Sequence, residues 1–185
     1  ARYVAPLVDT LDSRPRAALA RIRPISRRLL AVRYYMVRGH EVDSLWTWSE
    51  AQTSAFRASA EYDSLVAAVR AVQDTFALSN PGYAIRVHIG LRSLSKQIAN
   101  WNGVRSVGLA SDLLLSYCRE LMADTLLADT PNVESQVLFD SLFYYAPDPI
   151  EPTVALPGLS QHGQLRAFDF KITTSSGRLV AGASS

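Results

Sequence analysis

The hydrophobic period of the chain changes abruptly at Asn80-Pro81-Gly82, and this change limits the folds that the chain can adopt. Before this turn, apolar residues recur every three or four positions, which predicts an amphipathic helix that contains Tyr62, Leu65, Val66, Val69, Val72 and Phe76. After the turn, apolar residues occupy every second position, which predicts a strand over 83–91 with one face formed by Tyr83, Ile85, Val87 and Ile89. The fold must therefore contain both helices and a sheet.

Helices dominate the other predicted elements. Capping and period predict helices from Asp12-Ser13 to a stop or kink at Pro24, over 26–38, from Ser49-Glu50, over 93–101, over about 107–128 and over 132–144. Prolines 147, 149, 152 and 157 then predict an irregular connection, followed by two strands over 166–173 and 178–181. This order predicts an α+β fold with a helical N-terminal part and a small, mainly antiparallel sheet flanked by helices. We expect residues 1–79 to be a helical accessory region packed on a core of residues 80–185.

The composition is that of a globular protein. With 185 residues, of which 48% are apolar and 19% charged, the chain can bury a substantial core and differs from disordered sequences. It contains no run of about 18 or more apolar residues, so no transmembrane segment is expected. Its single cysteine, Cys118, excludes an internal disulfide and is expected to be a small buried hydrophobe.

The net charge of +2 conceals an uneven distribution. Residues 1–40 contain nine Arg and two Asp, whereas residues 41–185 contain ten basic and fifteen acidic residues. A basic segment can bind nucleic acid, anionic lipid or an acidic polymer, or it can be a solvated helix face packed on the acidic remainder. The second interpretation is favoured, and no motif that reads specific nucleic acid accompanies the arginines in question, Arg14, Arg16, Arg21, Arg23, Arg27 and Arg28.

A histidine and an aspartate near the C-terminus suggest metal chemistry. His162 follows a Pro-Gly turn, and Asp169, seven residues later, belongs to a predicted strand. An imidazole from a loop and a carboxylate from a strand suit a divalent metal such as zinc. These two residues are therefore the candidate metal ligands.

The residues around this pair resemble a family signature. The zinc D-alanyl-D-alanine peptidases, which cut bacterial cell-wall peptides, carry the signature Ser-x-His-x-x-Gly-x-Ala-x-Asp. Four residues match this signature in order and spacing, namely Ser160, His162, Ala167 and Asp169. Leu165 replaces the signature's Gly. The resemblance implies that zinc is the cofactor, that peptidoglycan stem peptides are the partners and that the protein is periplasmic or secreted. It also implies that Ser160 contacts the substrate.

A second segment is similar to an upstream element of the same family. Gly90-Leu91-Arg92-Ser93 resembles the family's Gly-Tyr-Arg-Ser, which leads into a helix that carries a Gln, here Gln97. The resemblance covers about residues 80–182 and makes Gln97 a candidate substrate contact. Independently, a guanidinium beside an amide carbonyl under attack can stabilise the negative charge on its oxygen. We therefore expect Arg92 to be catalytic if its strand neighbours the strand of Asp169.

Two ligands are fewer than a catalytic zinc site needs. In the family, a later Glu-Pro-Trp-His-like segment supplies a third ligand and a general base, but no His or Glu follows Asp169 here. Three explanations are open. The segment lies outside these 185 residues, or the chain binds peptides without cutting them. In the third, His40 or His88 completes the metal site. Glu41, Asp43 and Glu151 are the carboxylates that could replace the base, and their spacing does not distinguish them.

The leading hypothesis is therefore a zinc metallopeptidase, a hydrolase of the D-alanyl-D-alanine carboxypeptidase type. The alternative is a catalytically inactive module on the same fold that binds cell-wall peptides or another protein. A third hypothesis is binding of a polyanion by the N-terminal arginines, which would weaken steeply with salt.

Overall fold

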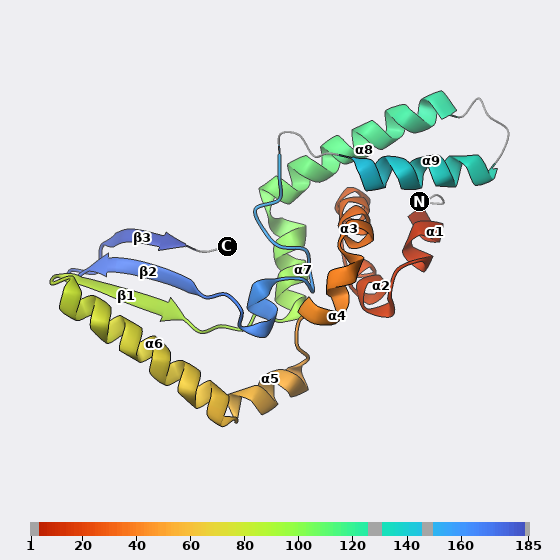
Figure 1. Ribbon diagram of the computed structural model, residues 1–185. Coiled ribbons are helices and arrows are strands. Elements are labelled where there is room, and N and C mark those ends of the chain that lie inside the picture. Colours follow the sequence, from red (N-terminus) through yellow and green to blue (C-terminus); the bar gives the residue numbers. More distant parts are fainter. Residues whose placement is uncertain (1–3, 126–130, 146–149, 184–185) are drawn as a thin grey trace. The chain divides into compact units, whose positions relative to one another are not determined.

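The computed structural model of the protein describes residues 4–125, 131–145 and 150–183, and it confirms the α+β class (Figure 1). Two compact units are present, and each is built from two separate stretches of the chain. Residues 1–46 and 94–160 form the first, called the helical unit below. Residues 47–93 and 161–185 form the second, called the sheet unit.

The helical unit is organised around α3. Its described elements are α1 (Val4–Asp9), α2 (Ser13–Leu19), α3 (Ile25–Val37), the 3₁₀ turn η1 (Gly39–Glu41), α4 (Val42–Leu45), α7 (Leu94–Gly103), α8 (Arg105–Thr125) and α9 (Pro131–Tyr144). Helices α1, α2, α8 and α9 all pack on α3. Among the described residues, every buried hydrophobic side chain belongs to this unit, the largest being Trp101, Tyr35, Leu19, Ile22, Leu30, Leu114 and Leu142.

The arginines near the N-terminus bind groups of the helical unit itself. Arg27 donates to the carbonyls of Trp101 and Val104 at 2.5 and 2.9 Å, where α7 ends. Arg14 forms ion pairs with Asp12 and Asp43. Arg21, Arg23, Arg28 and Arg33 also donate to acceptors of this unit. These guanidinium groups donate to carbonyl, carboxylate and hydroxyl oxygens that would otherwise need other donors.

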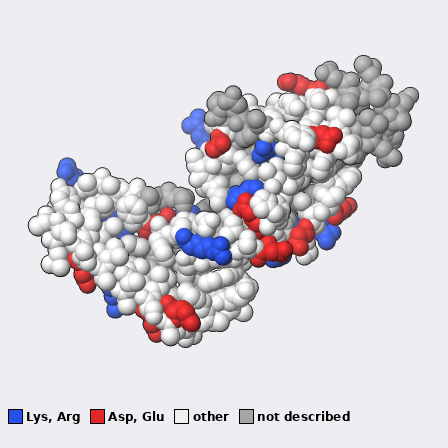
Figure 2. Space-filling model, in the orientation of Figure 1, with Lys and Arg blue, Asp and Glu red and all other residues white. Residues whose placement is uncertain are grey.

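The surface charge agrees with this structural role. On the face drawn in Figure 2, basic side chains are interspersed with acidic ones and do not gather into one continuous patch. Polyanion binding needs such a patch of accessible cations. The face in Figure 2 shows no such patch, and the third hypothesis stays a prediction.

The sheet unit consists of a small antiparallel sheet and two helices. Its described elements are α5 (Glu50–Arg57), α6 (Ala60–Ser79), β1 (Tyr83–His88), the 3₁₀ turn η2 (Gln161–Gln164), β2 (Asp169–Thr174) and β3 (Leu179–Ala183). The described strands are ordered β1-β2-β3, so the central strand β2 comes late in the chain. Ile85 lies opposite Ile172, and Val87 lies opposite Phe170.

One face of this sheet is covered by α6. Side chains of α6 and of the sheet line a shared apolar space, to which Ala68, Val69 and Val72 contribute from the helix and Ile85, Val87 and Phe170 from the strands. Because side chains alternate along a strand, Arg86, His88 and Lys171 lie on the opposite face. That face is called the open face below.

Most predicted elements are confirmed within one to three residues. Ser49 caps α5 with a capping box completed by Gln52, and Gly82 adopts the left-handed conformation (φ 87°) at the end of α6. β1 is shorter than predicted and ends at His88, and β2 begins only at Asp169 because residues 161–166 form a closed turn. The end of the predicted helix over 107–128 lies partly outside the described residues.

The predicted boundary at residue 80 does not coincide with a boundary of either compact unit. α8 and α9 follow that boundary but pack on α3, which precedes it. Cys118 is buried in the helical unit, and burial raises the pKa of its thiol to about 11, as expected of a small hydrophobe. No helix in the described part of the chain has the length and apolar character needed to cross a membrane.

Candidate functional site

Three of the five predicted site residues converge in the sheet unit. Nη2 of Arg92 lies 2.7 Å from Oδ2 of Asp169, and Nε2 of His162 lies 3.7 Å from Oδ1 of the same carboxylate. The His162 side chain is 8% exposed, and those of Arg92 and Asp169 are each 21% exposed. The three groups therefore form a partly buried cluster.

The sheet and its flanking backbone hydrogen bonds place this cluster. Asp169 opens β2 directly opposite His88, the last residue of β1. The chain continues from β1 to Arg92, whose backbone N–H donates to the His162 carbonyl at 3.2 Å. The N–H of Trp48 donates to the Gly163 carbonyl at 3.0 Å, which secures the other side of η2. Segments that are distant in sequence thus meet at one end of the sheet.

The turn that carries His162 closes through Leu165. The N–H of Arg166 donates to the Gln161 carbonyl at 2.9 Å, a six-residue closure typical of a Schellman motif. Such a closure needs a left-handed residue at its penultimate position, and Leu165 has φ 55°, the only positive φ of a described non-glycine residue. The Gly of the family signature is therefore replaced here at a position whose backbone conformation favours Gly.

The surroundings of His162 favour the neutral form of its imidazole. Burial lowers the pKa of His162 below its usual value, and the nearby Arg92 guanidinium lowers it further. Asp169 and a hydrogen bond at the Ala167 backbone raise this pKa, but by less than the first two effects lower it. A neutral imidazole is the form that binds a metal ion.

The distance between the two candidate ligands suits a shared metal ion. Two ligands on one tetrahedral zinc ion, each about 2.0 Å from it, lie about 3.3 Å apart. Nε2 of His162 and Oδ1 of Asp169 are 3.7 Å apart, so a small movement would bring both into a coordination sphere. The chemistry and spacing of these two donors therefore fit zinc.

A third ligand is not provided by the described residues. Within them, no group of three or more His, Cys, Asp or Glu side chains is arranged to hold a metal ion. His88 lies opposite Asp169 on the sheet but is exposed, and its ring lies over Gly90. His40 belongs to the helical unit, where its Nε2 lies 3.9 Å from Oε1 of Glu41. Neither therefore completes a described metal site.

Two hollows of the sheet unit border the cluster. One, of about 320 Å³, is lined by Arg92 and Ser93 together with Thr47, Trp48, Glu50, Thr53, Ser54, Arg57, Leu91 and Gly163. The other, of about 400 Å³, is lined by Asp169, Arg86, Val87, His88, Phe170 and Lys171. The Arg92–Asp169 ion pair joins a residue of one hollow to a residue of the other. An extended ligand that occupied both hollows would pass this pair.

The other two predicted residues, Ser160 and Gln97, belong to the helical unit. Both are buried, with exposed fractions of 5% and 4%. Oε1 of Gln97 accepts a hydrogen bond of 2.8 Å from the N–H of Gly158, whose φ of 88° and contact with the Trp46 ring leave no room for a side chain. In this structure Gln97 thus stabilises the Pro157-Gly158 turn, and substrate contact by Gln97 or Ser160 remains a prediction.

The carboxylates proposed to replace the missing base have other surroundings. Glu41 binds the Arg38 guanidinium at 2.8 and 2.5 Å, and Asp43 binds Arg14. Glu151 lines a separate hollow of the helical unit. Glu50, in contrast, lines the same hollow as Arg92 and was not singled out from the sequence, where its only signal is its position after the Ser49 cap.

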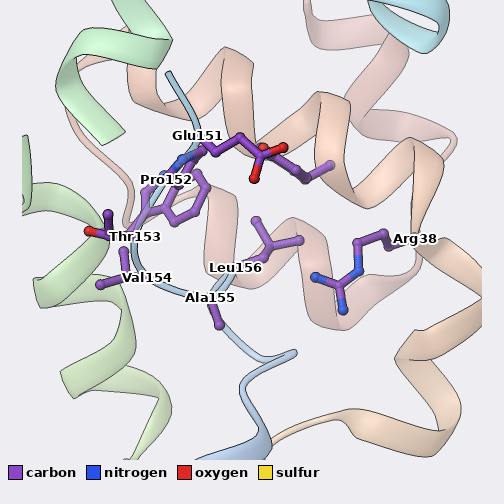
Figure 3. Close-up of a pocket in the computed structure, with 9 residues that line it drawn as sticks. Arg38, Glu151, Pro152, Thr153, Val154, Ala155 and Leu156 are labelled. Atoms are coloured by element: carbon purple, nitrogen blue, oxygen red, sulfur yellow. The ribbon is translucent and has the colours of Figure 1, made fainter. Parts of the chain in front are cut away.

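A further hollow of about 360 Å³ lies within the helical unit. It is lined by Tyr34, Arg38, Trp101 and the segment 151–156. Figure 3 shows the Arg38 guanidinium and this segment on opposite sides of it. Arg38 is already bound to Glu41, so this cation of the hollow is neutralised within the helical unit.

No family model, no curated protein and no solved structure matches this chain. The assignment of a function therefore depends on the chemistry of the site.

Proposed function

We propose that this chain is a zinc-dependent peptidase-like protein of the bacterial cell envelope that hydrolyses an amide bond in peptidoglycan stem peptides. The observation that carries this proposal is the convergence of His162, Asp169 and Arg92, three residues that belong to two separate sequence segments with a family resemblance. The resemblance of both segments to the D-alanyl-D-alanine peptidases supports the substrate class.

Each of the three residues has a separate role in this proposal. His162 and Asp169 would hold zinc, and the chemistry that zinc supplies when bound is activation of a water molecule at neutral pH. The Asp169 carboxylate forms an ion pair with Arg92. With zinc held by His162 and Asp169, the adjacent Arg92 guanidinium would be placed to stabilise negative charge that develops on the carbonyl oxygen of the scissile amide.

The same ion pair favours one alternative, a module that binds cell-wall peptides without cutting them. Arg92 already neutralises Asp169, so the cluster is electrostatically balanced with no metal ion. In this alternative, the two bordering hollows bind the peptide and Arg92 does not take part in catalysis. Peptide binding without product release, at saturating zinc, would select it.

The decisive experiment is zinc titration of chelator-treated protein by calorimetry. The wild-type protein should bind one zinc ion, and His162→Ala or Asp169→Asn should each weaken binding by about 100-fold or more, because each removes a ligand. His40→Ala is the matched control, since it removes an exposed imidazole from the helical unit. Failure of the wild-type protein to bind zinc, or full binding by both ligand variants, would refute the proposal.

The role of Arg92 is tested by the kinetics of D-alanine release from a peptide that ends in D-Ala-D-Ala. Arg92→Gln should lower kcat by about 100- to 1000-fold and leave KM nearly unchanged, since the interaction strengthens only as charge develops. Arg70→Gln, on the surface of α6, should leave both constants unchanged. An increase in KM alone would show instead that Arg92 only binds the ground state of the substrate.

A further inference from the structure

The open face of the sheet carries two cations directly opposite each other. Arg86 on β1 pairs in register with Lys171 on β2, so their side chains leave the sheet on the same face. Directly opposite residues have Cβ atoms about 5 Å apart. α6 covers the other face and leaves these two side chains exposed.

Neither cation is neutralised within the described part of the molecule. Among the described residues, no ion pair or hydrogen bond joins the side chain of Arg86 or Lys171 to a carboxylate or a carbonyl. Like charges directly opposite each other destabilise a sheet. A bound anion would remove this repulsion, because one carboxylate can accept hydrogen bonds from both groups.

The two cations also line the 400 Å³ hollow, to which Asp169 contributes as well. Lys171 and Asp169 are two residues apart on β2 and lie on the same face, about 7 Å apart along the strand. Successive side chains on one face of an extended peptide have the same spacing. A peptide that lies along the hollow, with its scissile bond at the cluster, would thus bring an acidic side chain two residues away onto Arg86 and Lys171.

We propose that Arg86 and Lys171 form a carboxylate-binding subsite on the open face and that the protein selects acidic peptides. The inference depends on the proposed function, because it names the class of peptide that this site accepts. A peptide is the favoured ligand because the side chains on one face of an extended peptide have the same spacing as Lys171 and Asp169 on β2.

The test compares peptides that differ by one carboxylate. Calorimetry on the chelator-treated 185-residue protein would measure the binding of acetyl-Glu-Ala-D-Ala-D-Ala and of acetyl-Gln-Ala-D-Ala-D-Ala. The Glu peptide should bind about three- to tenfold more tightly than the Gln peptide. This ratio of the two affinities should fall toward one in about 0.5 M salt. Arg86→Gln and Lys171→Gln should each remove most of the ratio, and Arg70→Gln should preserve it.

The outcomes separate this inference from the proposed function. A ratio of one in the wild-type protein, a ratio that survives both substitutions, or no binding of either peptide would overturn the subsite. Because these measurements need no metal, a preserved ratio in a protein that fails to bind zinc would support the subsite and refute the hydrolase. Zinc binding by His162 and Asp169, together with equal affinities for the two peptides, would support the hydrolase and overturn the subsite.

Discussion

At the scale of single residues, Leu165 links the sequence signature to backbone geometry. It occupies the left-handed position of the turn that carries His162, with φ 55°. A side chain at such a φ costs about 1–2 kcal/mol relative to Gly. The substitution therefore lowers stability locally while the turn still forms and still brings His162 toward Asp169.

We expect Leu165→Gly to raise the free energy of unfolding by about 1 kcal/mol, because the relief at positive φ exceeds the loss of a half-buried side chain. Urea denaturation would measure the change. Gln164→Gly is the matched control, since Gln164 has a negative φ in the same turn, and this variant should be less stable than wild type. Destabilisation by both variants would contradict the explanation.

The pKa of His162 offers a second test at this scale. Arg92→Gln should raise this pKa, because Arg92 is one of the groups that lower it, whereas Asp169→Asn should lower it further. NMR titration of the imidazole would measure both shifts, with Arg70→Gln as the control. Because the folded pKa is lowered, the contribution of neutral His162 to stability is complete above about pH 6.5 and is lost as the pH falls through the folded pKa. Shifts of the same sign in the two variants would refute this electrostatic account.

The sequence predicted that three candidate residues lie close together, but it did not predict their surroundings. Spacing and resemblance selected Arg92, His162 and Asp169, and these residues converge. The ion pair between Arg92 and Asp169 was not predicted. The sequence signature does not show which oxygen of the Asp169 carboxylate Arg92 or His162 contacts. Glu50 was also missed, since nothing in its local sequence indicates that α5 would share a hollow with Arg92.

At the scale of helices and strands, local signals were sufficient to predict most elements. The period change at residues 80–82 and the cap at Ser49 act over a few residues, so they can be recognised in the sequence alone. Pairing between strands depends on contacts distant in sequence. The register that places Arg86 opposite Lys171 could therefore not be derived from either segment alone.

We expect Arg86→Gln to raise the free energy of unfolding by about 0.5 kcal/mol at low salt, because it removes the repulsion from Lys171. The gain should shrink in about 1 M salt, where exposed charges are screened. Urea denaturation at both salt concentrations would show this, with Arg70→Gln changing little as the control. If Arg86→Gln binds the Glu peptide less tightly and is also more stable than the wild-type protein, Arg86 contributes to peptide binding at a cost in stability. A lower free energy of unfolding in this variant would contradict the predicted repulsion between Arg86 and Lys171.

At the scale of the whole molecule, buried apolar side chains are distributed unevenly. All the described ones belong to the helical unit, whereas the buried residues of the sheet unit are Thr47, His162 and Gly163. Hydrophobic burial is the main favourable term in folding. The unit that carries the candidate site therefore has the smaller intrinsic stability.

Hydrogen exchange should reveal this difference. We expect backbone amides of β1 and β2 to exchange at least about tenfold faster than those of α3 and the first half of α8, because opening the sheet unit exposes less apolar surface. Mass spectrometry of peptic fragments would measure both rates. Addition of zinc should slow exchange in η2 and β2, and the variant His162→Ala should lose that response. Equal protection of the two units would contradict the inference.

The late position of β2 in the chain also affects how the protein is made. Tyr83 of β1 pairs with Thr174 of β2, so a ribosome must deliver almost all of these 185 residues before the sheet can close. The helical unit needs residues only through 160 and can mature earlier. In the interval, the nascent β1 has no partner for its backbone donors and acceptors, and such an unmatched edge is the kind of surface that promotes aggregation and recruits chaperones.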